Sequence, residues 1–114
     1  MMQLTMQLPD ELAVRIQPMS QWLPTILQIS LIGFRTTAIS TATELVNFLS
    51  LNPTPQEFMN YHVSENSQER LQRLLTLNEA GLLAESERNE LDELEKLEHL
   101  VVTLKTQLAY NLQQ

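Results

Sequence analysis

The sequence predicts a mainly α-helical fold with a short N-terminal strand, followed by helices and ending in a long amphipathic helical hairpin. Three observations support this. Only 2 glycines occur in 114 residues, so little of the chain needs left-handed backbone. Leu, Gln, Glu and Ala are frequent and favour helix. Leucines recur at steps of three and four in the last third. With 43% hydrophobic and 18% charged residues, the composition is that of a folded domain.

The strand is predicted for residues 2–8, Met-Gln-Leu-Thr-Met-Gln-Leu, because apolar and polar side chains alternate strictly. Every second residue would then lie on the same face. The inward residues are Leu4, Met6 and Leu8, and the outward residues are Gln3, Thr5 and Gln7. Pro9 ends the run.

Helices are predicted for most of the next 40 residues. A brief helix over 10–17 starts with two acids, which favour a helix N-terminus, and stops at Pro18. A second helix starts at Leu23 or Pro24 and runs to about Phe34; it is apolar on most sides, so it must be buried in a core or a dimer interface. A third covers 40–49.

Two prolines in Asn-Pro-Thr-Pro, residues 52–55, forbid a continuous helix and mark a boundary. A short helix over 55–61 follows, with Thr54 as its cap. The predicted organisation is therefore a strand-helix-helix dimerisation region plus third helix (1–51), a Pro-rich connector with its short helix (52–63) and a C-terminal helical hairpin (64–114).

The hairpin consists of a helix capped by Ser64 or Ser67 and ending near Gly81, then a helix from about Glu85 to Asn111. Apolar residues on the last helix form a seam close to that of a coiled coil, which predicts packing against a partner or dimer mate, or within the chain. The residues of this seam are Leu91, Leu94, Leu97, Val101, Leu104 and Leu108.

The N-terminal order of alternating strand, Leu-Pro-Asp-Glu-Leu-Ala and two helices resembles the ribbon-helix-helix repressors over about 35 residues. In that family two strands pair across a dimer and enter the major groove of DNA. The resemblance implies that Gln3, Thr5 and Gln7 contact base edges and that Arg15 contacts phosphate. The strand carries no Lys or Arg, however, and the alternative is that it only pairs with its dimer mate.

A second resemblance covers nearly the whole chain. The segments LPDELAVRIQPMSQWLPTILQISL and NPTPQEFMNYHVSENSQERLQRLLTLNEAGLLAESERNELDELEKLEHLVVTLKTQLA are similar to those of a family of small, largely uncharacterised bacterial proteins, abundant in cyanobacteria and described as antitoxin-like. The chain departs from the family at Ala84-Glu85, where Thr-Pro is frequent. The resemblance implies a small binding protein rather than an enzyme.

Charge is distributed unevenly. The net charge is −7, of which residues 51–114 carry −6. This half repels phosphate and anionic lipid, so any DNA contact is expected at the opposite end of the chain. The acidic half suits a basic protein partner, or it is simply a solvated surface.

No catalytic, cofactor-binding or metal-ligating set is predicted. Glu95 and His99 share a helical face, but two ligands are too few for a metal site. The two glycines are isolated, so they form no phosphate loop. The chain has no Cys, which fits a cytoplasmic location, and the stretch from Trp22 to Phe34 is too short and mixed to span a membrane.

The function expected from the sequence is that of an antitoxin-like, homodimeric binding protein. It would bind its own operator DNA through the N-terminal strand and hold a protein partner, such as a toxin, through the hairpin. The alternative is a scaffold or assembly factor that binds only protein.

Overall fold

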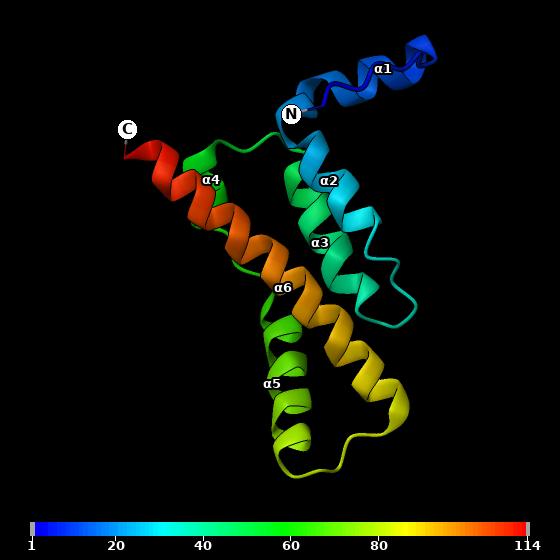
Figure 1. Ribbon diagram of the computed structural model, residues 1–114, viewed down its shortest axis with the longest axis vertical. Coiled ribbons are helices and arrows are strands. Elements are labelled where there is room, and N and C mark those ends of the chain that lie inside the picture. Colours follow the sequence, from blue (N-terminus) through cyan, green and yellow to red (C-terminus); the bar gives the residue numbers. More distant parts are fainter. Residues whose placement is uncertain (1, 114) are drawn as a thin grey trace.

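The computed structural model describes residues 2–113, and it confirms the mainly helical prediction (Figure 1). The elements in chain order are α1 (Asp10–Ile16), the 3₁₀ helix η1 (Gln17–Trp22), α2 (Leu23–Ser30), α3 (Ile39–Leu49), α4 (Pro55–Met59), α5 (Glu65–Glu79) and α6 (Glu85–Leu112).

The prediction of an N-terminal strand is wrong: residues 2–9 adopt no regular secondary structure, and residues 2–113 contain no strand. The alternating pattern determines which side chains share a face, but a strand also needs a neighbour for its backbone hydrogen bonds. The rest of the described chain is helical or irregular and supplies none. The side chains predicted to face inward are largely exposed: Leu4 is 76% exposed and Met6 is 58% exposed.

Residues 2–16 form an arm at one end of the molecule. Helix α1 begins directly after Pro9, has Asp10 and Glu11 in its first turn and buries none of its residues. It packs chiefly against η1 and projects beyond the other helices (Figure 1). The predicted helix over 10–17 is therefore present, but it adds nothing to the core.

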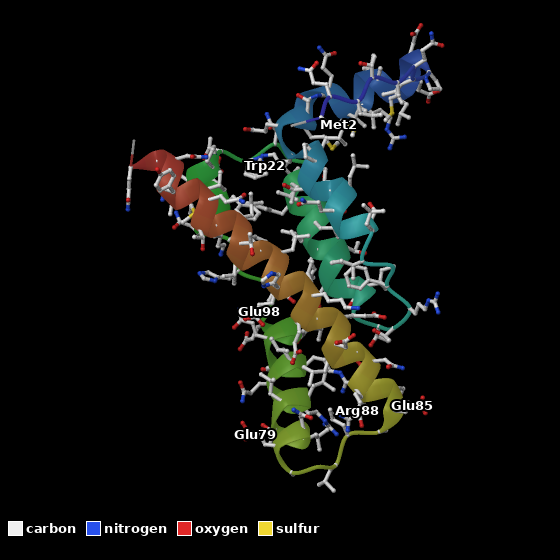
Figure 2. All side chains as sticks on the ribbon, viewed as in Figure 1. Met2, Trp22, Glu79, Glu85, Arg88 and Glu98 are labelled. Atoms are coloured by element: carbon white, nitrogen blue, oxygen red, sulfur yellow. The ribbon has the colours of Figure 1, made fainter. Side chains whose placement is uncertain are left out.

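Trp22 fixes the start of α2 to the connection between α3 and α4. It is buried, its Nε1 donates a 2.8 Å hydrogen bond to the carbonyl of Pro53, and its ring stacks on Phe58 with centroids 5.0 Å apart (Figure 2). Thr54 caps α4 as predicted, because its side chain accepts from the amide of Glu57. The proline-rich boundary thus becomes a tight, anchored turn.

Helix α6 is the longest element, and it crosses both the α2–α3 pair and α5 (Figure 1). The N-terminal cap of α6 is weaker than that of α5. Ser64 accepts from the amide of Ser67 at the start of α5, whereas Ala84 has no side-chain acceptor and only its own amide is bonded, to Glu87. Gly81, with φ of 71°, lies just past the last residue of α5 and ends that helix as predicted.

The core consists of two clusters. The Trp22 cluster contains the buried residues Trp22, Ile29, Ala42, Leu45, Leu49, Phe58 and Leu97. The Leu74 cluster contains Ala38, Leu74, Leu91 and Leu94. Helix α6 contributes to both, so it joins the two halves of the molecule.

The molecule is extended rather than spherical, with principal extents of 49 × 36 × 28 Å. Its radius of gyration is 16.1 Å, against about 13 Å for a compact chain of this length. Its accessible surface is 8492 Å², against about 6,400 Å² for a compact monomer of its mass. The chain therefore keeps much more surface in contact with water than its size requires.

Candidate binding surfaces

The four residues predicted to contact DNA lie on the arm. Gln3, Thr5 and Gln7 are exposed in the irregular segment before Pro9, and Arg15 is exposed in the last turn of α1. No sheet presents the three polar side chains as a row. The structural basis for direct base reading is therefore missing from the described chain.

The residues of the α6 seam belong to the core of this chain. Leu91 and Leu94 are buried in the Leu74 cluster, and Leu97 is buried in the Trp22 cluster. The remaining three, Val101, Leu104 and Leu108, are half-buried against the Trp22 cluster. The helix thus packs within its own chain through this seam.

A buried ion pair joins the two helices of the hairpin. Arg70 on α5 donates to both carboxylate oxygens of Glu90 on α6, at 2.9 and 2.8 Å. These hydrogen bonds lower the pKa of Glu90 below its ordinary value, although burial opposes the effect. No spacing rule in the sequence indicates this pair, because its members lie 20 residues apart on different helices.

Glu44 ties α3 to the start of α5. Its carboxylate accepts from the amide of Ser64 at 2.9 Å and from the hydroxyl groups of Ser64 and Ser67 at 3.1 and 2.6 Å. Burial raises the pKa of Glu44, but the hydrogen bonds from Ser67 and Ser64 outweigh burial and lower the pKa overall. The sequence does set Glu44 apart, because it is the only acidic residue between residues 16 and 56.

Glu93 performs the same task for the loop before α3. Its carboxylate accepts from the amides of Arg35 and Thr36, at 3.0 and 3.2 Å, and from the Thr36 hydroxyl at 2.6 Å. Like Glu44 and Glu90, it holds a helix in place, and all three have their acceptor oxygens committed to this chain. The three carboxylates stabilise contacts between segments of the fold and are not arranged as an acid–base pair.

The α2–α3 region carries three large apolar side chains that are exposed, and we call these three residues together the neutral face. They are Leu27 (50%), Leu31 (84%) and Ile39 (53%). Beside them lies a shallow groove of about 400 Å³, lined by Ile29, Ser30, Gly33, Phe34, Ile39, Ala42, Thr43 and Val46. The sequence carries only Arg35 and Glu44 as charged residues from 16 to 56, so this region has no net charge.

A second, open groove of about 600 Å³ runs between α2 and α6. Ile32, Leu100 and Leu104 supply its apolar lining. Asp92, Glu95, Lys96 and His99 are its charged or ionisable residues. Lys96 lies 3.4 Å from Asp92, and within residues 2–113 no ion pair involves Glu95.

The free end of the α5–α6 hairpin is rich in charge, as Figure 2 shows for Glu79, Glu85 and Arg88. Glu95 and His99 line the α2–α6 groove together, but no group of three metal-ligating residues occurs within residues 2–113. Across the same residues, no helix is both long and apolar enough to cross a membrane.

Comparison with models of protein families, with curated proteins and with solved structures finds no match to this chain.

Proposed function

We propose that this chain is a non-catalytic binding protein of the cytoplasm, antitoxin-like in that it acts by holding another protein. It forms a homodimer through the neutral face, and its acidic half holds a basic protein partner. The observation that supports this most is the uneven charge: residues 16–56 carry no net charge and expose Leu27, Leu31 and Ile39, whereas residues 51–114 carry −6.

The exposed area supports a role in association. The chain exposes about 2,100 Å² more than a compact monomer of its mass. A standard interface buries about 800 Å² on each partner. The surplus, to which the exposed arm contributes, exceeds the area that one such contact needs.

Charge decides which half meets a second copy. Residues 51–114 carry −6, so two such halves repel each other, whereas the region from 16 to 56 carries no net charge. Leu31 is 84% exposed on that region and is the most accessible large side chain of the neutral face. A symmetric contact therefore buries Leu27, Leu31 and Ile39 and leaves the acidic half in water.

The dimer is tested by the double variant Leu31→Glu with Ile39→Glu. Sedimentation velocity should show dimers for the wild type and monomers for the variant, because two carboxylates on each copy would be buried in the contact. Leu82→Glu is the matched control: Leu82 is 68% exposed in the turn between α5 and α6 and should leave the dimer intact. A wild type that stays monomeric at all concentrations contradicts the contact.

The partner contact is assigned to the α2–α6 groove. Its apolar lining suits one face of an amphipathic helix, and Glu95 on its rim suits a Lys or Arg of that helix. Binding there covers a surface of the partner and thereby blocks it. The net charge of the acidic half adds to the rate of association rather than to specificity.

A synthetic amphipathic peptide rich in Leu and Lys tests this assignment by calorimetry. It should bind the wild type, and its affinity should fall as salt is added. Glu95→Lys should weaken binding about tenfold, whereas Glu79→Lys, at the end of α5 and outside the groove, should change it much less. Equal binding by both variants rules out the groove as the partner site.

A further inference from the structure

A cavity of about 260 Å³ is lined by residues of both core clusters. The Trp22 cluster supplies Leu45 and Leu97 to its wall, and the Leu74 cluster supplies Leu94 with Leu71 packed beside it. Val63, Val101 and Val102 add to the apolar lining. The cavity is thus bounded by α3, α5, α6 and the segment before α5, from which Tyr61, His62 and Val63 contribute.

The size and lining of the cavity suit a small organic molecule. An apolar cavity of about 150 Å³ in a protein is large enough to hold benzene. Protein interiors are otherwise close-packed, so a space of this size leaves wall atoms without contacts that a ligand would supply. One side opens to water beside His62, Glu98 and Val102, which are exposed, and Figure 2 shows Glu98 on α6 at the level of the start of α5.

The polar groups in the wall indicate what the ligand must carry. The hydroxyl groups of Thr41 and Ser67 are bonded within the chain, to Ser67 and to Glu44 respectively. Lys105 donates one hydrogen bond, 2.8 Å long, to the carbonyl of Tyr61. An ammonium group has three N–H donors, and no carboxylate within residues 2–113 forms an ion pair with Lys105.

We propose that this cavity binds a small molecule with an apolar body and a carboxylate, such as a medium-chain fatty acid. The apolar body lies against Leu71, Leu94 and Val101, and the carboxylate accepts from the ammonium of Lys105. This site is separate from the neutral face and from the α2–α6 groove, so it stands or falls independently of both.

The test is calorimetry on the full chain with three probes of equal length: octanoate, octan-1-ol and octylamine. Octanoate should bind tightest and octanol about tenfold more weakly, because a charge-assisted hydrogen bond is lost. Tighter binding of octylamine would show that Glu98 rather than Lys105 governs the site and would overturn the carboxylate assignment. Binding of none of the three would overturn the cavity as a site.

Two variants locate the binding. Lys105→Met keeps the apolar stem and should reduce the octanoate affinity to that of octanol, while Lys96→Met, which lies outside the cavity, should leave it unchanged. Val101→Phe fills the cavity and should abolish binding in a chain that circular dichroism shows to be folded. Unchanged octanoate binding by Lys105→Met contradicts the proposal even if Val101→Phe does not fold.

Methyl NMR spectra distinguish the cavity from the exposed apolar surface. Octanoate should shift the methyl signals of Leu71, Leu94 and Val101. Shifts confined to Leu31 and Ile39 would mean that the probe only coats the neutral face, and would contradict the proposal.

Discussion

Arg70 and Glu90 form a two-pronged ion pair in which Nε and Nη2 of the arginine each donate to a different carboxylate oxygen. The Glu90 side chain is only 7% exposed, whereas that of Arg70 is 41% exposed. The pair therefore consists of a buried anion held by a cation that reaches in from the surface. It fixes how α5 lies along α6.

Replacing Arg70 by Met should destabilise the protein by about 1–3 kcal/mol, because the buried Glu90 carboxylate loses its two donors. The loss should lie below the upper end of this range, because Arg70 is partly exposed and water can reach the Glu90 carboxylate once the guanidinium is removed. Urea unfolding followed by circular dichroism measures the change. Arg73→Met, at an exposed position on the same helix, is the control; equal losses for both variants would mean that the pair contributes nothing.

Stability should fall as the pH is lowered below the ordinary glutamate pKa of 4.5. Hydrogen bonds from Arg70 lower the pKa of Glu90; for Glu44, hydrogen bonds from Ser67 and Ser64 outweigh the burial that raises its pKa. Both groups therefore contribute stability at pH values above 4.5, and this contribution is lost as the pH falls through their folded-state pKa values. Unfolding free energies measured from pH 7 downward should decline less steeply for Glu90→Gln than for the wild type. Parallel profiles would contradict this linkage.

Trp22→Phe should cost about 0.5–1.5 kcal/mol through the lost hydrogen bond to Pro53. The loss is moderate because Gln21 Nε2 also donates to that carbonyl, at 3.2 Å, so the carbonyl keeps one partner. The double variant with Gln21→Ala should therefore lose more than the sum of the single losses. Since Trp22 is the only tryptophan, circular dichroism rather than fluorescence should follow unfolding. Strict additivity would show that the two donors do not share the carbonyl.

Leu97→Ala should destabilise the fold by about 2–5 kcal/mol, because Leu97 is buried where α6 meets the Trp22 cluster. Leu112→Ala removes the same atoms at the exposed end of the same helix and should cost far less. Thermal or urea unfolding compares the two. A similar small loss for both would contradict the packing of the seam within the chain.

Much of the helical architecture could be predicted from the sequence, because local signals mark it. The prolines and Gly81 lie at helix starts, near helix ends or in the connections between helices, and the seam of α6 identifies its buried side. The same kind of local signal predicts a strand over residues 2–8, and this prediction is wrong. A strand needs a neighbouring strand to pair with, which residues 2–113 do not supply.

The surfaces could be predicted less well. The seam predicts packing against a partner, a dimer mate or the chain itself, and no periodicity indicates the α2–α3 residues against which Leu97 and Val101 pack. The exposure of Leu31 and Ile39 could not be deduced either, because both belong to apolar stretches that look like core. The uneven charge is the one feature of the sequence that indicates the surfaces, because it distinguishes the region of the neutral face from the acidic hairpin.

An isotope-filtered NOESY spectrum of a mixed labelled and unlabelled sample detects the contact that we propose between two copies of the neutral face. Intermolecular signals should connect the methyl groups of Leu27, Leu31 and Ile39 of one copy with the same groups of the other. Intermolecular signals that come only from the arm or from α6, or a sample without any, would contradict this contact.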